Sequence, residues 1–154
     1  MGLGEMQLTH VAIAVHDIDE ASKRMAGLGM SFATPTELQI PTSYRGTETV
    51  AGLKFAYAPG NPIPIELVQP ATGDSTIARF LRERGEGVQH FGYSVDNVEA
   101  VVGRANAAGV EVDWVISDKH GLAIAFLSGE AMFGVSAELV RRDPPVNVME
   151  WLKR

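Results

Sequence analysis

The chain contains no cysteine in its 154 residues, which excludes disulfide bonds and thiolate metal sites. It has no basic excess either, since 19 acidic residues outnumber 13 basic ones, and the net charge of -6 argues against general nucleic-acid binding. No apolar run reaches the roughly 20 residues of a membrane span, and no secretory signal is visible at the start. We therefore expect a cytoplasmic protein, with neither nucleic acid nor membrane as a partner, in which only nitrogen and oxygen atoms hold a metal.

What the chain does contain is an internal repeat. Residues 9–21 match residues 89–101, and the match places His10 on His90. Each copy begins with alternating apolar residues, which are typical of a strand, and continues with an apolar stripe at helical spacing. An agreement that covers strand, helix start, helix stripe and helix stop indicates a duplicated module.

Each predicted helix has its own start and stop signals. Asp17 is the expected N-cap of the first helix, and Gly29 is expected to end it. In the second copy Asp96 or Asn97 supplies the cap, and Gly109 ends the helix. The same kinds of signal recur in both copies, which supports the duplication.

The patterns downstream of each helix are of the β type, so each copy is expected to form a strand, a helix and three further strands. The expected fold class is therefore α+β, with two βαβββ modules in tandem that form one cupped mixed sheet. The modules cover about residues 7–70 and 87–142 of a single domain, 1–154, and a linker helix in 71–86 joins them. The remaining residues, 143–154, are expected to be an ordinary C-terminal extension.

One histidine and one glutamate per module form the candidate site. Glu66 and Glu138 each lie between two apolar residues on a strand that is expected to be central. A buried carboxylate costs free energy unless it meets a cation, and neither strand offers a Lys or Arg on the same face beside it. The histidines share their strand faces with alanine, glycine and serine, which leave a hollow. We expect His10, Glu66, His90 and Glu138 to converge there on one divalent ion, for which Zn, Fe, Co, Ni or Mn are all suitable.

These residues resemble the vicinal oxygen chelate superfamily, which includes glyoxalases, bleomycin resistance proteins and dioxygenases. The likeness covers nearly the whole chain, and it implies the glyoxalase-like fold with His10, Glu66, His90 and Glu138 as metal ligands. Within the superfamily the sequence is most similar to methylmalonyl-CoA epimerases. Three parts of the chain carry this likeness: the stretch that begins at His10, a long stretch within residues 65–90, and the His120-Gly pair together with the later Glu138-Leu pair.

The resemblance implies a metal-dependent epimerase that removes a proton next to a carbonyl, as in methylmalonyl-CoA. It implies that Glu138 is also a proton-transferring base and that His120 lies near the bound acyl group. The epimerases carry a second glutamate just before the third strand, where this chain reads Val-Ala-Gly at residues 50–52, so Glu48 is the candidate to replace it. The expected partners are an acyl-CoA or another small carbonyl compound, and a second copy of the chain in a homodimer.

Three other functions of the same superfamily stay open. A glyoxalase-like lyase or isomerase needs only one glutamate base on the metal. A ring-cleaving dioxygenase uses Fe(II) with two histidines and one carboxylate, which would leave Glu66 as a surplus ligand. A non-enzymatic protein that binds small molecules without a metal would be expected to have an incomplete ligand set, whereas all four candidates are present here.

Overall fold

The computed structural model describes residues 6–59, 62–130 and 132–145. The elements in chain order are β1 (Met6–Ala14), α1 (Ile18–Ala26), β2 (Thr36–Tyr44), β3 (Thr47–Ala58), β4 (Ile65–Thr72), α2 (Thr76–Arg84), β5 (Gly87–Val95), α3 (Val98–Ala107), β6 (Val112–Asp118), β7 (Gly121–Leu127) and β8 (Ser136–Arg141). None of the helices in the described part of the chain has the length and apolarity that crossing a bilayer requires.

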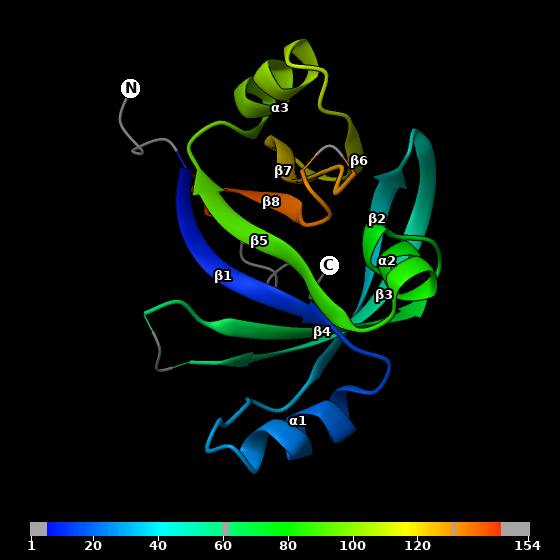
Figure 1. The fold of residues 1–154 in the computed structure, drawn as a ribbon. Coiled ribbons are helices and arrows are strands. Elements are labelled where there is room, and N and C mark those ends of the chain that lie inside the picture. Colours follow the sequence, from blue (N-terminus) through cyan, green and yellow to red (C-terminus); the bar gives the residue numbers. More distant parts are fainter. Residues whose placement is uncertain (1–5, 60–61, 131, 146–154) are drawn as a thin grey trace.

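The strands of these described ranges close into a barrel in the order β1-β4-β3-β2-β6-β7-β8-β5 (Figure 1). Each half of the chain supplies four neighbouring strands, and within each half the first and last strands pair in parallel, β1 with β4 and β5 with β8. The halves meet where β1 pairs with β5 and β2 pairs with β6, both antiparallel. The expected α+β fold with two βαβββ modules is confirmed.

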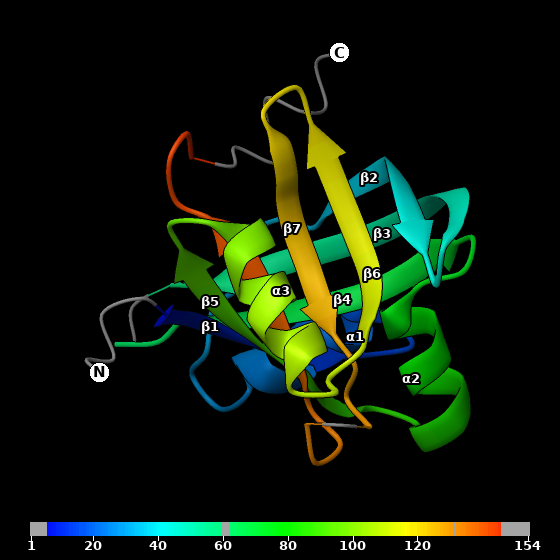
Figure 2. The ribbon, with the colours of Figure 1, turned by 90° about the horizontal axis from the view of Figure 1, so that it is seen from above.

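The three helices lie against different parts of this barrel (Figures 1 and 2). Helix α1 packs against β3 and β4, and α3 packs against β6, β7 and β8. Helix α2 packs against β1, β4 and β5, and its Ile77 and Leu81 belong to the same buried cluster as the interior residues of the barrel. The strip of the outer faces of β1 and β5 that lies between α1 and α3 is therefore not covered by either helix.

The helix starts agree with the cap residues expected from sequence. The side chain of Asp17 accepts the backbone N–H groups of residues 19 and 20, and Asn97 accepts the N–H of residue 100. Ser75 does the same for α2. The predicted end of α1 was too late, because the helix stops at Ala26 and Leu28 is 83% exposed instead of extending the apolar stripe.

Strand β2 is the element whose position the sequence did not predict. Its burial alternates, with Leu38, Ile40 and Thr42 facing the interior between exposed neighbours. The turn to β3 contains Arg45 at φ 51° and Gly46 at φ 79°, a left-handed pair that fits a tight hairpin turn. The C-terminal tail is described only as far as residue 145, so its expected role as an extension lies mostly outside the described residues.

A buried ion pair joins the three strands β6, β7 and β8. Arg141, which is 6% exposed, donates from Nη1 to Asp118 Oδ1 at 3.1 Å and to the carbonyl of Leu122 at 3.2 Å. Both partners are largely withdrawn from water, so the loss of one charge leaves the other without compensation.

We expect the substitution Asp118→Asn to lower the free energy of unfolding by about 3 kcal/mol at pH 7, measured by urea denaturation. The matched control is Asp96→Asn. Asp96 pairs with Arg142, the residue that follows β8, but its side chain is 72% exposed. An exposed pair contributes at most about 1 kcal/mol, so the control should change stability little. Equal effects of the two substitutions would contradict the role assigned to the buried pair.

The same pair predicts an acid dependence. The contact with Arg141 holds the pKa of Asp118 below its usual value. A carboxyl whose pKa is lowered by folding stabilises the protein above its unfolded pKa of about 3.9, and this contribution is lost as the pH falls towards the folded pKa. The stability difference between the wild type and Asp118→Asn should therefore shrink below about pH 4. A difference that is the same at pH 3 and pH 7 would assign the loss to packing.

Candidate metal centre

The four candidate ligands come from the four neighbouring strands β4, β1, β5 and β8. The strand register places them in two rows across the sheet, and each row holds a histidine, a small residue and a glutamate. The rows are His10–Gly92–Glu138 and Glu66–Ala12–His90. Each row combines residues of both halves, so the pairing of β1 with β5 assembles the cluster.

The small residue in each row makes room for the ring beside it. A Cβ added at Gly92 would overlap the imidazole of His10. Ala12, which is the counterpart of Gly92 in the repeat, is completely buried. The hollow that the sequence indicated beside the histidines is therefore occupied, at least in the first row, by an imidazole.

The ligand atoms lie at distances from one another that suit a metal. His10 Nε2 lies 3.0 Å from Glu138 Oε2, 3.2 Å from Glu66 Oε2 and 3.2 Å from His90 Nε2. His90 Nε2 lies 3.5 Å from each carboxylate. Ligands at about 2.1 Å from a first-row divalent ion are neighbours at about 3.0 Å in an octahedron and about 3.4 Å in a tetrahedron. The donor atoms therefore fit such an ion, and His10, Glu66 and His90 each place a ligand atom within 4.8 Å of the other two.

The cluster is buried and electrostatically coupled. His90 is 2% exposed, Glu66 7% and His10 8%. Burial alone lowers the pKa of His10, but the carboxylates of Glu138 and Glu66 outweigh it and raise that pKa to about 10; the pKa of His90 is raised for the same reasons. Burial tends to raise the pKa of both glutamates, but the imidazoles outweigh it and lower those values. The carboxylates are thus held in the charged form that metal ligation needs.

A hydrogen bond behind His10 sets which of its ring nitrogens carries the proton. The hydroxyl of Thr9 donates to the carbonyl of Gly92 at 3.0 Å, and its oxygen lies 3.1 Å from His10 Nδ1. Because a hydroxyl has one proton to donate, the ring nitrogen must be the donor in the second contact. His10 therefore carries a proton on Nδ1, so the proton that its raised pKa retains, and that metal binding would displace, is the one on Nε2, which faces the cluster.

The equivalent residue of the repeat does the same for His90. Gln89 is 1% exposed, and its amide nitrogen donates to the hydroxyl of Ser136 at 3.3 Å. This orientation turns the amide oxygen towards His90 Nδ1, which donates to it at 2.6 Å. Both rings thus present Nε2 to the cluster, as metal-binding histidines held by an outer hydrogen bond do. Protons on both Nε2 atoms would instead point two N–H groups at each other across 3.2 Å.

Each half also places an aromatic ring against its own histidine. Tyr57 lies edge-on to His10, with 5.9 Å between ring centroids, and Phe126 lies edge-on to His90 at 5.1 Å. The register pairs Tyr57 with Glu66, and it pairs Phe126 with Glu138. Partial burial and the carboxylates of Glu66 and Glu138 raise the pKa of the Tyr57 hydroxyl, which stays protonated beside Glu66.

The structure does not bring Glu48 or His120 to the cluster. Glu48 is the second residue of β3 and is exposed, whereas Tyr57, which faces Glu66, is the second from the end of the same strand. An extended strand keeps these two positions far apart. His120 lies in the exposed turn between β6 and β7, where its N–H donates to Asp118, and it does not line the cavity beside the cluster. In this structure neither residue lies beside the four candidate ligands, and their roles in a reaction stay predictions.

Four residues that the sequence did not single out complete the site: Thr9, Tyr57, Gln89 and Phe126. A signal for two of them was available, because Thr9 and Gln89 directly precede the repeated histidines and both carry hydrogen-bonding side chains. Tyr57 and Phe126 depend on the pairing register of distant strands, which has no local signal.

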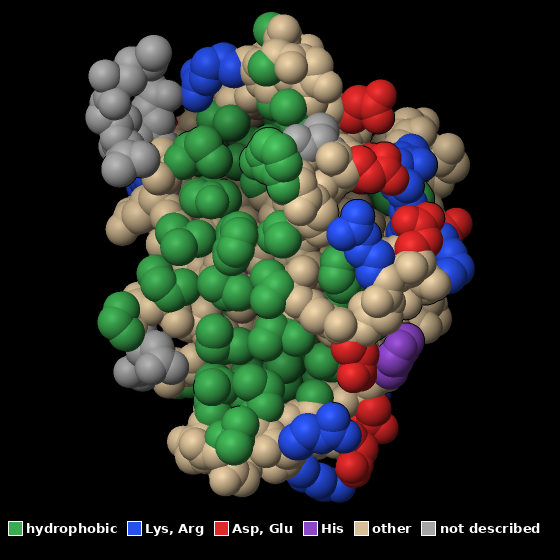
Figure 3. All heavy atoms as spheres, viewed as in Figure 1, with side chains coloured by type: hydrophobic (Ala, Val, Ile, Leu, Met, Phe, Trp, Pro, Cys, Tyr) green, Lys and Arg blue, Asp and Glu red, His purple; other side chains and the backbone are tan. Residues whose placement is uncertain are grey.

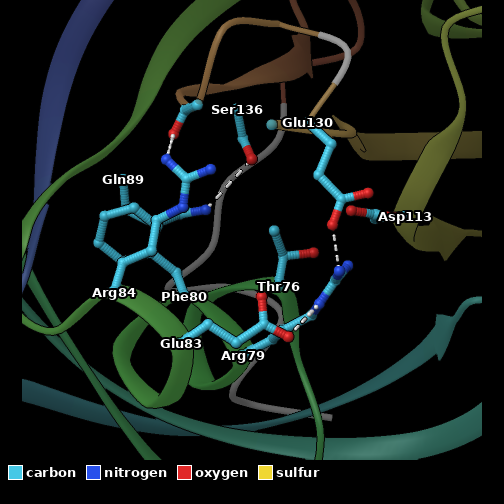
Figure 4. Close-up of a pocket in the computed structure, with 11 residues that line it drawn as sticks. Thr76, Arg79, Phe80, Glu83, Arg84, Gln89, Asp113, Glu130 and Ser136 are labelled. Atoms are coloured by element: carbon cyan, nitrogen blue, oxygen red, sulfur yellow. Dashed lines mark hydrogen bonds and ion pairs between the residues drawn. The ribbon is translucent and has the colours of Figure 1, made fainter.

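A second pocket lies between α2 and the segment that leads into β8, and it contains Arg79 and Arg84 (Figure 4). Arg79 forms ion pairs with Glu83 and Glu130, which raise its pKa further, and Arg84 donates to the carbonyl of Gly134. With Asp113 also in the wall, carboxylates outnumber guanidinium groups. Arg79 and Arg84 are therefore compensated locally, and this pocket does not form an anion site.

The model of the Glyoxalase/Bleomycin resistance protein/Dioxygenase superfamily matches residues 9–126 of the chain. The chain belongs to this superfamily. Its members usually bind a divalent metal, which agrees with the donor set described above. The family resemblance inferred from the repeat is confirmed.

Several of the individual proteins that the chain is similar to are methylmalonyl-CoA epimerases. The mitochondrial methylmalonyl-CoA epimerase of Homo sapiens is 30% identical over 139 residues, which are 86% of this chain and 72% of the human protein. The crystal structure of methylmalonyl-CoA epimerase from Mycobacterium tuberculosis has a TM-score of 0.57 and 26% identity, and the match covers 94% of this chain and 91% of that one. A variant of the Streptomyces coelicolor epimerase in complex with 2-nitronate-propionyl-CoA shares the fold, with a TM-score of 0.64 at 22% identity and coverage of 93% and 99%.

We expect the outer hydrogen bonds to govern metal affinity. The substitutions Thr9→Val and Gln89→Met each remove an acceptor for Nδ1–H, and each should weaken Zn²⁺ binding by about 10–100-fold in a chelator competition assay. Thr9→Ser keeps the hydroxyl and should keep the affinity. In the NMR spectrum of the zinc-loaded wild type, both Nδ1–H protons should exchange slowly with water. Unchanged affinity in Thr9→Val, or the same loss in Thr9→Ser, would contradict the assignment.

Proposed function

We propose that the chain is a metal-dependent enzyme that removes a proton from the carbon next to a carbonyl, with methylmalonyl-CoA or a similar acyl-CoA as the substrate. The observation that carries the proposal is the convergence of His10, Glu66, His90 and Glu138 within 3.0–3.5 Å contacts. The names of the human and mycobacterial relatives support the substrate class. The ion would be held by these four residues, and Zn, Co, Ni, Mn and Fe all suit this set.

The chemistry that a bound divalent ion supplies is polarisation of the carbonyl, which makes the neighbouring C–H bond more acidic. Glu138 takes the proton as a carboxylate and returns it as a carboxylic acid. If the carboxyl proton exchanges with solvent before it is returned to the same face of the carbon, the substrate becomes labelled without inversion. Protonation by a second acid on the opposite face gives the epimer.

The surroundings of the two carboxylates favour Glu138 as the base. Glu66 faces the Tyr57 hydroxyl, which interacts with it and stabilises its charged form. Glu138 faces the ring of Phe126, which offers no hydrogen bond of this kind. Of two equivalent carboxylates, the one without the hydroxyl keeps more of its basicity.

A glyoxalase-like lyase or isomerase is the second candidate, and the position of Glu48 favours it. Epimerisation needs a second group on the opposite face of the carbon, and Glu48 does not line the cavity that Glu138 and Glu66 line. Besides Glu138, Glu66 is therefore the remaining carboxylate that lines the cavity. A one-base reaction needs neither Glu48 nor Glu66 as a second base. The ring-cleaving dioxygenase is disfavoured, because its set of two histidines and one carboxylate leaves Glu66 unused. The non-enzymatic binding protein would be favoured by a metal content near zero after the protein has been loaded.

We expect metal-loaded protein in D₂O to replace the C2 hydrogen of methylmalonyl-CoA with deuterium, and chelator-treated protein not to do so. The exchange is followed by proton NMR. Glu138→Gln should lower the exchange rate by about 10²–10⁴-fold, since that is the usual contribution of a general base. Glu48→Gln should leave it unchanged because that carboxylate lies outside the site. The metal content of each variant is measured alongside.

The outcomes separate the candidates. Exchange with inversion supports the epimerase, and exchange without inversion supports a one-base enzyme. If loaded wild-type protein gives no exchange, methylmalonyl-CoA is removed as substrate, and formation of a thioester from a hemithioacetal then tests the glyoxalase-like reaction. A large loss in Glu48→Gln would mean that the described position of Glu48 is not the reacting one.

The homodimer belongs to the same proposal. The outer faces of β1 and β5 carry an apolar patch made of three cross-strand pairs, Leu8–Tyr93, Val11–Phe91 and Ile13–Val88. Leu8, Phe91 and Val88 are 37%, 36% and 40% exposed. Figure 3 shows hydrophobic side chains in a continuous strip over this face, between the positions of α3 and α1 in Figure 1. An exposed apolar area of this kind is typical of an interface, and a second copy of the chain would cover it.

We expect the protein to sediment as a dimer and Phe91→Glu to raise the dimer dissociation constant by at least about 30-fold, as loss of a central interface residue does. Leu28→Glu is the control, because Leu28 is 83% exposed at the end of α1 and lies outside the patch. A monomeric wild type, or equal behaviour of both variants, would exclude this interface.

A further inference from the structure

The cavity beside the candidate metal centre is the interior of the barrel, and its wall is almost wholly hydrocarbon. Glu66, His90 and Glu138 form one side of it. The rest of the wall consists of apolar side chains, most of them from β2, β3, β6 and β7, which include Leu38, Ile40, Leu53, Ile116, Ile124 and Phe126. The space is about 470 Å³, including the part open to solvent. A ligand that reaches the metal ligands therefore lies against an apolar surface.

Polar groups on this wall are few and uncharged. Apart from the candidate ligands, the described lining residues offer only the hydroxyl of Tyr57, which faces Glu66, and the indole nitrogen of Trp114. Trp114 is 1% exposed, and its Nε1 has no hydrogen-bond partner among the described residues. No Lys or Arg belongs to the described lining. A second charged group of a ligand would have nothing to pair with here and would lose its hydration.

We propose that the substrate of this site carries an uncharged hydrocarbon substituent larger than methyl on the carbon next to its carbonyl, and that this substituent lies between β2, β3, β6 and β7. The inference rests on the proposed function, because the candidate metal centre places the oxygens of the substrate. The apolar wall then selects what is attached beside them. The favoured class is α-alkyl or α-aryl acyl compounds, and the methyl group of methylmalonyl compounds would fill little of the space.

The test uses 2-oxo acids, which present two neighbouring oxygens to a cation and vary only in the attached chain. Binding of pyruvate, 2-oxobutanoate, 2-oxopentanoate and 2-oxohexanoate to the zinc-loaded protein is measured by calorimetry and by the fluorescence of Trp114, which lines the cavity. Affinity should rise about fourfold with each added methylene. The matched probe is 2-oxoglutarate, which has the five carbons of 2-oxopentanoate but a carboxylate in place of the terminal methyl group. It should bind at least about tenfold more weakly than 2-oxopentanoate.

A variant tests the position of the substituent. Ile40→Phe enlarges a wall residue of β2 that is not among the metal ligands, so it should weaken 2-oxohexanoate binding more than tenfold and leave pyruvate unchanged. Should this variant fail to fold, the series on the wild type still decides. A flat series, equal binding of 2-oxoglutarate and 2-oxopentanoate, or no binding of any member overturns the inference. A rising series in a protein that exchanges no C2 hydrogen supports the apolar pocket and contradicts the proposed reaction.

Discussion

The mutual neutralisation of two carboxylates and two imidazoles inside the barrel is the interaction on which the rest of the site depends. Glu66 and His90 are almost completely buried, and an ionised carboxylate at such a position is expensive unless positive charge lies beside it. Two imidazolium–carboxylate pairs or one divalent ion with two neutral imidazoles give the same net charge. The hydrogen bonds of Thr9 and Gln89 keep a proton on Nδ1 of each ring in both arrangements. The 3.2 Å between the two Nε2 atoms favours the second arrangement, because two imidazolium rings would point N–H groups at each other there.

The cluster exists only where the two halves of the chain meet, so fold and site are constrained together. Neither half holds a complete row, and a shift of one residue between β1 and β5 would turn every side chain of one strand to the other face. The pairing has irregularities between Leu8 and His10 and between Ala12 and Ile13, on either side of the ligand positions. Close contact at Gly92, where no Cβ fits, further limits the register.

The repeat made the ligand residues and the module order predictable, because both copies encode the same strand, cap and helix signals around the same histidine. The positions of Glu48 and His120 were not predictable in this way. They depend on how far β3 and the β6–β7 hairpin extend, and a polar segment such as β2 shows its strand character only by one-sided burial. Tyr57 reaches the site because β3 pairs with β4 in one particular register, which no local pattern specifies.

The duplication also explains why the site is symmetric in its ligands and asymmetric in its walls. Equivalent positions on β3 and β7 face the two glutamates, but one is Tyr57 and the other is Phe126. The two carboxylates therefore have different neighbours, a phenol for Glu66 and a hydrocarbon ring for Glu138. Helix α2 adds Ile77 to the cavity from one side only, since it lies between the modules and has no counterpart. In the proposed reaction, a symmetric centre fixes where the substrate oxygens lie, and the residues that break the symmetry decide which carboxylate takes the proton and which substituent fits.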